Sequence, residues 1–233
     1  RATAAAPASA ETALVLHARA NRAGLARVAE AARAAGAEVE TVLGDLTETG
    51  TAADLVARAR ARFGRLDALV SNAGKSLRKP IGEVTGAELD QAFKLAAGAF
   101  LGLTTAALPL LEKSSASRIV AVSSFVAHTQ RAALGPFPAT AAARAGLEAL
   151  VKALAHQVAP KGILVNAVAP GFVVKDPDNP SKLTPEQIAR LEAEIPLGRR
   201  ARPEEIARPI AWLASADNSY MTGQVLRIDG GLE

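Results

Sequence analysis

The sequence has no cysteine, few aromatic residues and no long uninterrupted hydrophobic run. Without cysteine it forms neither a disulfide framework nor a thiolate metal site, which fits a cytoplasmic protein. Aromatic residues make up only 3%, so the core must be built from Ala, Leu, Val and Ile. The longest mostly apolar run, residues 95–111, contains Gly, Thr and Pro and is short for a membrane span. We therefore interpret it as a buried core helix and expect no membrane association.

Charge of one sign is not concentrated enough to indicate nucleic-acid binding. The net charge is +4, and arginines gather in residues 58–62 and 199–202. No aromatic side chains alternate with these arginines as stacking platforms for bases. We interpret both stretches as solvated helix faces or loops and predict no nucleic-acid partner.

Short apolar or β-branched runs alternate with helical patterns along the whole chain. The expected strands are residues 14–16, 39–43, 68–71, 119–122, 163–168 and 225–228. The expected helices are residues 24–35, 51–63, 86–113, 139–158, 184–193 and 203–214. This alternation predicts an α/β fold, a doubly wound parallel sheet with helices on both faces, in one domain over residues 1–233. Turn residues dominate the start of 172–196, which we interpret as a flap on the substrate side.

A set of short motifs lies at the ends of these expected strands and helices. The motifs are Asn72-Ala73-Gly74, Ser123-Ser124, Thr140-Ala-Ala-Ala-Arg144, Asn166-Ala-Val-Ala-Pro170-Gly171 and Asp229-Gly230-Gly231. Together they resemble the short-chain dehydrogenase/reductase family, and within it the 3-oxoacyl-thioester reductases. The resemblance covers essentially all 233 residues. It implies a Rossmann-like fold and a reductase of a small carbonyl compound.

Two features of such a fold are missing from this sequence: a first strand and the Gly-rich turn that follows it. The turn would bring the backbone close to a cofactor pyrophosphate at a helix N-terminus. Residues 1–7 resemble the inside of the first helix, and 14–16 the family's second strand. The first strand would lie between the second and the fourth, so its loss would split the sheet and leave two unpaired edges. Two interpretations remain open. We favour the one in which residues upstream of Arg1 supply the strand; in the other, the chain is locally rearranged.

The resemblance assigns a cofactor role to several residues that follow strands. Arg19, after the strand at 14–16, suits the 2′-phosphate of NADP(H) through bidentate contacts, or is a surface arginine. The other expected cofactor contacts are Asp45, Leu46, Asn72, Ala73, Gly74, Pro170 and Gly171. Lys175 stands where family members place a Thr that contacts the nicotinamide carboxamide. NADP(H) is the expected cofactor.

The expected catalytic set is altered at most of its positions. Ser124 matches the serine that holds the substrate carbonyl oxygen, a role that the flanking motif favours over that of a strand-end turn residue. Thr140 replaces the proton-donating tyrosine, and an aliphatic hydroxyl is a far weaker acid than a phenol, whose pKa is near 10. Arg144 replaces the lysine; it keeps the positive charge, and so a contact with the cofactor ribose, but cannot relay a proton. Ala96 falls where an asparagine would anchor a water.

The sequence offers a histidine and a single tyrosine as possible replacement acids. His128 lies in the segment between Ser124 and Thr140 and titrates near neutral pH, so it is a candidate acid or a surface residue. Tyr220, the single tyrosine, lies in a stretch that leads into the last strand and has a structural role.

Two functions therefore remain open. One is an atypical NADP(H)-dependent reductase that acts on a small carbonyl compound. The other is a catalytically inactive relative that binds a nucleotide, a metabolite or a partner subunit. In either case the resemblance implies a homo-oligomer, a dimer or tetramer that pairs helices 86–113 and 139–158.

Overall fold

The computed structural model describes residues 8–130, 135–175 and 183–232, and these residues form two parallel sheets. The smaller sheet pairs β1 (Ala13–Ala18) with β2 (Glu38–Leu43). The larger sheet has the order β3-β4-β5-β6. Its strands are β3 (Ala68–Ser71), β4 (Arg118–Val122), β5 (Leu164–Pro170) and β6 (Val225–Ile228). The predicted α/β fold with parallel strands is confirmed.

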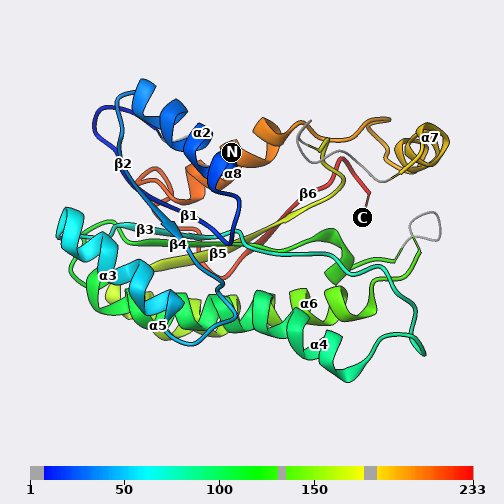
Figure 1. The fold of residues 1–233 in the computed structure, drawn as a ribbon, viewed down its shortest axis with the longest axis horizontal. Coiled ribbons are helices and arrows are strands. Elements are labelled where there is room, and N and C mark those ends of the chain that lie inside the picture. Colours follow the sequence, from blue (N-terminus) through cyan, green and yellow to red (C-terminus); the bar gives the residue numbers. More distant parts are fainter. Residues whose placement is uncertain (1–7, 131–134, 176–182, 233) are drawn as a thin grey trace.

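Helices cover both faces of this arrangement (Figure 1). On one side lie α2 (Arg22–Ala34), α7 (Pro185–Ala193) and α8 (Pro203–Leu213). On the other side lie α3 (Thr51–Phe63), α4 (Gly86–Phe93), α5 (Ala99–Leu111) and α6 (Pro138–Val158). Short 3₁₀ turns, η2 (Phe125–Ala127) and η4 (Ala159–Lys161), follow β4 and α6. Each expected helix and strand is present within a few residues of its predicted bounds, apart from the one at 86–113.

The core of the larger sheet is its two central strands. Every residue of β4 is buried, and Val165 to Ala169 of β5 are buried as well. One face packs against α5 and α6 and the other against α8. Such strands must be apolar on both sides, which explains their near-continuous Val, Ile and Ala composition.

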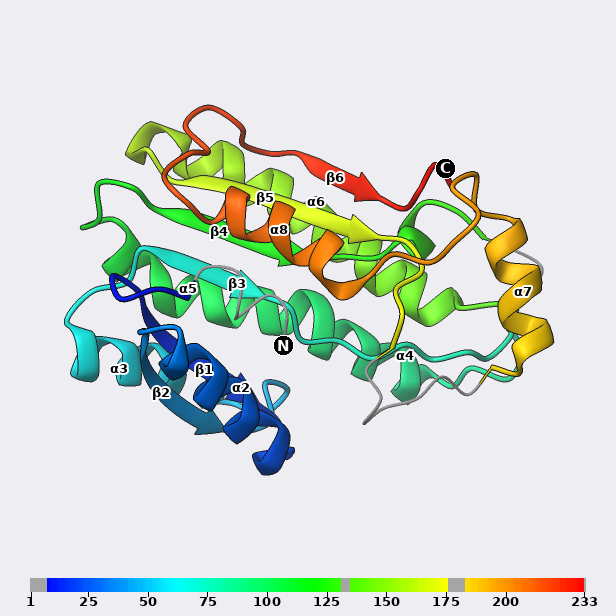
Figure 2. The ribbon, with the colours of Figure 1, turned by 90° about the horizontal axis from the view of Figure 1, so that it is seen from above.

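The two sheets are not joined by hydrogen bonds between β1 and β3 in the described part of the chain. The first strand expected from the family resemblance would lie between β1 and β3. The smaller sheet lies beside the β3 edge of the larger one (Figure 2). Helix α3 packs on β1, on β2 and on α5, which itself packs on β3. Within the described residues, helix contacts therefore link the two sheets.

The helix expected over 86–113 is interrupted, so that prediction was wrong in one respect. A π-helical turn, η1 (Lys94–Gly98), separates α4 from α5. Such turns widen a helix locally and are frequent near functional sites. The alternation of Ala and Leu in this region carries no signal that distinguishes a π turn from an α turn.

The apolar run at 95–111 is not fully buried, contrary to expectation. Ala99, Phe100, Leu103, Ala107 and Leu111 are buried. Leu101 on the opposite side is 55% exposed, and Phe93 of α4 is 37% exposed. By length and composition alone, Gly86–Leu111 is apolar enough to cross a membrane, but core helices of soluble proteins pass the same test. One side of this helix packs on the larger sheet, as a core helix does.

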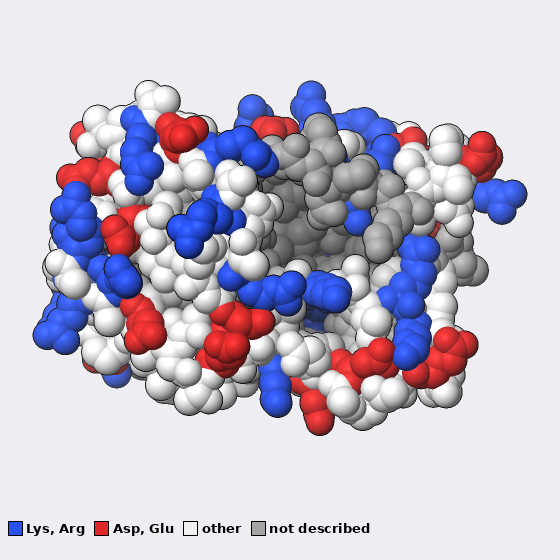
Figure 3. Space-filling model, in the orientation of Figure 1, with Lys and Arg blue, Asp and Glu red and all other residues white. Residues whose placement is uncertain are grey.

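The arginine-rich stretches are paired with carboxylates. Arg58 and Arg62 of α3 bind Glu40 and Glu38 of β2, at 3.4 and 3.0 Å. Basic and acidic side chains are interspersed over the face shown in Figure 3. This pattern supports the interpretation of these stretches as solvated faces.

Candidate active site at the carboxyl ends of the strands

The expected site residues follow the carboxyl ends of neighbouring parallel strands. Arg19 follows β1, Asp45 follows β2, Asn72 follows β3 and Ser124 follows β4. Gly171 follows β5. Because parallel strands end at the same edge, the structure brings these residues to one side of the molecule, where doubly wound sheets bind ligands.

At one end of this edge, Arg19 and Asp45 face each other across the tips of β1 and β2. The Arg19 Nη1 atom lies 3.9 Å from Asp45 Oδ2, and the Arg19 side chain is 67% exposed. Hydrogen bonds from the Thr47 backbone and hydroxyl, helped by the Arg19 charge, lower the pKa of Asp45 below its ordinary value. Leu46 is half-buried beside it. The guanidinium is thus accessible to an anion, although Asp45 competes for it.

At the other end, Arg144 is buried and points at the sheet. Its Nη1 donates a hydrogen bond to the Val122 carbonyl at 2.5 Å, from α6 to the end of β4. A Cβ atom added at Gly74 would lie 1.7 Å from Arg144 Nη2, so the guanidinium rests directly on the Gly74 backbone. Burial lowers the pKa of Arg144, and the nearby Glu148 carboxylate partly offsets that shift. A side chain at position 74 would therefore displace the Arg144 guanidinium.

The space around Arg144 is closed in this conformation. The cavity holds about 10 Å³, roughly one water, and is lined by Gly74, Lys75, Ala92, Leu95, Ala96, Thr140, Ala143 and Arg144. Ala96, on the π-helical turn, is buried against it, so the cavity wall has a methyl group where the resemblance expects an asparagine. No ring of a cofactor or substrate fits while Arg144 keeps this position.

Thr140 is buried at the start of α6 and serves a structural contact. Its Oγ1 accepts a hydrogen bond from the Leu77 backbone at 2.9 Å and so fixes the loop after β3. Pro138 is in the first turn of this helix, where its fixed φ is favourable. Thr140 and Arg144 share one face of α6, as their spacing predicted. The Thr140 contact to Leu77 accounts for the residue without a catalytic role.

The two serines after β4 have different environments. Ser124 is half-buried and extended, with φ −164°, at the start of η2. Ser123 is buried and its hydroxyl donates to Glu148 Oε1. His128 Nε2 lies 3.0 Å from the same oxygen. Sequence reasoning proposed His128 but missed Glu148, a charged residue on the buried face of α6.

Close packing against Asp229 explains the glycine in the loop after β5. A Cβ atom at Gly171 would lie 2.6 Å from the Asp229 Cα atom, and the Gly171 backbone donates to Ile228 at 2.9 Å. Pro170 is half-buried at the end of β5, and Lys175 is exposed. These contacts join β5 to the end of β6 and do not by themselves indicate a ligand.

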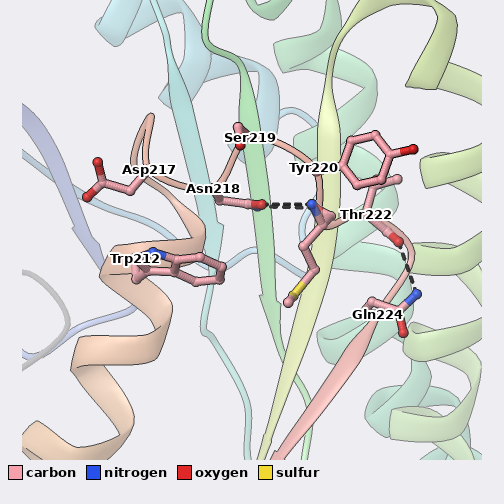
Figure 4. A pocket seen from close by; sticks show the side chains of 8 residues that line it. Trp212, Asp217, Asn218, Ser219, Tyr220, Thr222 and Gln224 are labelled. Atoms are coloured by element: carbon pink, nitrogen blue, oxygen red, sulfur yellow. Dashed lines mark hydrogen bonds between the residues drawn. The ribbon is translucent and has the colours of Figure 1, made fainter.

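A larger surface hollow lies at the opposite edge of the sheet. It has a volume of about 430 Å³ and is lined by Trp212, Asp217, Asn218, Ser219, Tyr220, Met221, Thr222 and Gln224 (Figure 4). The Thr222 hydroxyl accepts from the Val165 backbone at 3.0 Å, near the beginning of β5. At about 3.3 Å per residue, that point is about 16 Å from Pro170. Tyr220 is 96% exposed there and cannot replace a proton donor at the carboxyl edge.

Comparison with known proteins identifies the family to which the chain belongs. The model of the family described as enoyl-(acyl carrier protein) reductase matches residues 1–233. The chain belongs to the short-chain dehydrogenase/reductase family, whose oxidoreductases use a nicotinamide cofactor. The resemblance stated from the motifs is confirmed.

Individual relatives agree on the family and differ in cofactor. The chain is 32% identical over 197 residues to the 3-oxoacyl-[acyl-carrier-protein] reductase FabG of Salmonella typhimurium, covering 84% of this chain and 79% of that protein. It is 26% identical to the NADH-dependent reductase A1-R′ of alginate metabolism, with a TM-score of 0.86 over 100% of this chain and 91% of the other. It is 25% identical to YwfH, an NADPH-dependent reductase of bacilysin biosynthesis, with a TM-score of 0.90 over 100% and 92%.

The two ends of the site fit a dinucleotide unequally. Arg19 and Asp45 offer a cation and a carboxylate at the tips of adjacent strands, which suits the adenosine end. At the end where the family resemblance places the nicotinamide, only about 10 Å³ is free around Arg144. A ribose would fit there only if the Arg144 side chain moved.

Proposed function

We propose that this protein is an NADP(H)-dependent reductase of a small carbonyl compound. The observation that carries the proposal is the exposed Arg19 guanidinium at the carboxyl end of β1, in a chain that belongs to an oxidoreductase family. An arginine at this point suits a 2′-phosphate, which NADPH has and NADH lacks. The 32% identity to FabG supports a 3-oxoacyl thioester as the first substrate class to test.

The residues of the carboxyl edge take the following roles in this proposal. Asp45 and Leu46 contact the adenine, and Asn72-Ala73-Gly74 lies along the ribose. Pro170-Gly171 covers the nicotinamide, and Ser124 binds the substrate carbonyl oxygen. Arg144 leaves the Val122 carbonyl and binds the nicotinamide ribose when the cofactor enters. Thr140 contributes a hydrogen bond at most, and His128 is the candidate proton source.

The flap at 172–196 is proposed to border the substrate. Leu191 and Ile195 pack with Phe125 and Phe137, which flank the candidate site residues Ser124 and Thr140. Residues 176–182, within the flap, lie outside the described residues. An apolar cluster over the loop after β4 suits an acyl chain.

A homo-oligomer is also proposed. Leu101, Phe93 and Leu89 leave apolar surface exposed along α4 and α5, at 55%, 37% and 37%. Paired copies would cover it.

The closed cavity favours a second candidate, an inactive nucleotide-binding or partner-binding subunit. Only about 10 Å³ is free around Arg144, and no phenol is present there. The reductase would turn over a carbonyl substrate, and the inactive subunit would not.

Calorimetric titration with NADPH and NADH tests the proposal. We expect micromolar NADPH binding and weaker NADH binding. Arg19→Glu should weaken NADPH binding by about 10- to 100-fold, since a charge-assisted contact contributes roughly 1.5–3 kcal/mol. Arg60→Glu on the exposed side of α3 is the matched control and should bind like the wild type.

Oxidation of NADPH with acetoacetyl-CoA and a panel of simple ketones then separates the candidates. Steady turnover supports the reductase. Binding without turnover supports the inactive subunit, and binding of neither nucleotide removes both nucleotide-based functions.

A further inference from the structure

A buried carboxylate lies behind the candidate catalytic residues. Glu148 is 5% exposed and is one helical turn after Arg144 on α6. Its Oε1 atom accepts hydrogen bonds from the Ser123 hydroxyl and from His128 Nε2, the latter at 3.0 Å. A carboxylate in such a position is costly to bury unless it is paired and hydrogen-bonded. Two separate segments, the end of β4 and the end of η2, supply these partners.

The geometry distinguishes this cluster from a nucleophilic triad. In a serine nucleophile site, the serine hydroxyl donates to a histidine, which a carboxylate orients from its other side. Here Ser123 and His128 bind the same carboxylate oxygen, so the Ser123 hydroxyl is directed at Glu148. Ser123 therefore fixes the carboxylate, and the carboxylate in turn orients the imidazole.

The orientation of His128 leaves one ring nitrogen for chemistry. Because Nε2 is bound to Glu148, Nδ1 is the atom that remains for another partner. The His128 side chain is 22% exposed, so water can exchange its protons. Ser124, the candidate ligand of the carbonyl oxygen, is four residues earlier across the single turn of η2.

We propose that Glu148 is a positioning residue that makes His128 the proton donor of this site. The inference rests on the proposed reductase function. His128 gives its Nδ1 proton to the substrate carbonyl oxygen as the carbonyl carbon takes hydride from the reduced nicotinamide cofactor. The N–H bond breaks, an O–H bond forms and the C=O bond becomes a C–O bond. The neutral imidazole then takes a proton from water.

The charges around the pair suit this role. Arg144 and Glu148 are the charged residues on the buried face of α6, which packs against η2. Arg144 is bound to the Val122 carbonyl, and its charge also acts on Glu148. An imidazolium at His128 would thus lie 3.0 Å from a carboxylate oxygen of opposite charge.

The test compares Glu148→Gln with the wild type in two measurements. Gln has the same shape and can still accept the Ser123 hydrogen bond, but it carries no charge. By NMR at about pH 7, the fraction of His128 in the imidazolium form should fall severalfold in the variant. The ring signals of His17, His128 and His156 are assigned with His128→Gln. With acetoacetyl-CoA, kcat should fall about 10-fold or more while KM changes less than about twofold.

Two controls keep the result interpretable. Glu30→Gln, on the exposed side of α2, should leave both measurements unchanged. The double variant Glu148→Gln, His128→Gln should be no slower than His128→Gln alone, because Glu148 acts through His128. A merely structural role for Glu148 would instead slow the double variant further and would not change the imidazolium fraction.

Failure of this inference and failure of the proposed reductase function give different experimental results. If the wild type turns over and Glu148→Gln has the same kcat, this inference fails and the reductase function stands. An unchanged imidazolium fraction in the variant also overturns it. If the wild type binds NADPH but reduces no carbonyl compound, the reductase function fails, and the proton-donor role with it.

Discussion

The two sheets of this protein carry the two ends of the candidate site, and they differ in burial. In the β1–β2 sheet the strand residues are half-buried or exposed, and at its tips Arg19 is exposed and Asp45 is half-buried. In the β3–β6 sheet, β4 is wholly buried, and Arg144 and Glu148 are enclosed against it. The end that would recognise the adenosine is therefore loosely packed, and the end that would perform chemistry is tightly packed.

This difference indicates where the stability of the fold resides. Regions with few buried apolar contacts open locally at low free energy, and core strands open only with the whole molecule. We expect β1 and β2 to open before β4 and β5. Cofactor binding at the tips of β1 and β2 would then stabilise the weaker region most.

The largest expected effect comes from matched truncations in the two sheets. Val120→Ala in β4 removes two methyl groups from a fully buried site and should lower the free energy of unfolding by about 2–3 kcal/mol. Val15→Ala in half-buried β1 should cost less than about 1 kcal/mol. Urea denaturation followed by circular dichroism measures both. Equal losses at the two sites would remove the contrast between the sheets.

A smaller effect is expected at the contact between Gly74 and Arg144. In Gly74→Ala the new methyl group displaces the Arg144 side chain, which then loses its hydrogen bond to the Val122 carbonyl. We expect a loss of about 1–2 kcal/mol, or roughly 2–8 °C in Tm. Gly86→Ala is the matched control because a Cβ atom at Gly86 meets nothing within 4 Å. A Tm for Gly74→Ala no lower than that of Gly86→Ala would show that Arg144 is not held where the structure places it.

The smallest expected effect is a pH dependence of Tm that arises at the start of α8, which packs on the larger sheet. Hydrogen bonds from Arg199 and from the Arg202 backbone lower the pKa of Glu205, at the start of α8, to about 2. Because this pKa is depressed in the folded state, the stabilisation is present above the ordinary pKa of about 4.5 and is lost as the pH falls toward 2. Glu205→Gln should flatten the fall in Tm over that range. A scan of Tm against pH that gives parallel curves for the two proteins would contradict the assignment.

Sequence reasoning placed the strands and helices well because their signals are local. The buried runs of β4 and β5 and the apolar stripe of α6, with Leu147, Val151 and Val158, follow from periodicity alone. The π-helical turn at Lys94–Gly98 was missed because its Ala and Leu residues suit an α-helix equally well. The apolar run at 95–111 was expected to be a buried core helix, but composition cannot show which side faces a neighbour, and Leu101 is exposed.

The site was predictable in position and less so in its contacts. Motif spacing gathered Arg19, Asn72 and Ser124 at one edge, as the structure has them. The pairing of Glu148 with Ser123 and His128 spans 25 and 20 residues, so no local pattern indicates it. Nor does the sequence show that Arg144 turns to the Val122 carbonyl, since that choice depends on the absence of a side chain at Gly74.

The packing of α3 has a mechanical consequence. Helix α3 contacts β1, β2 and α5, and α5 contacts β3, so α3 links the two sheets that carry the two ends of the candidate site. Small sliding movements of packed helices are a common form of domain motion. A shift of α3 along α5 would change the span between Arg19 and Gly74, and so the length of ligand that can reach both.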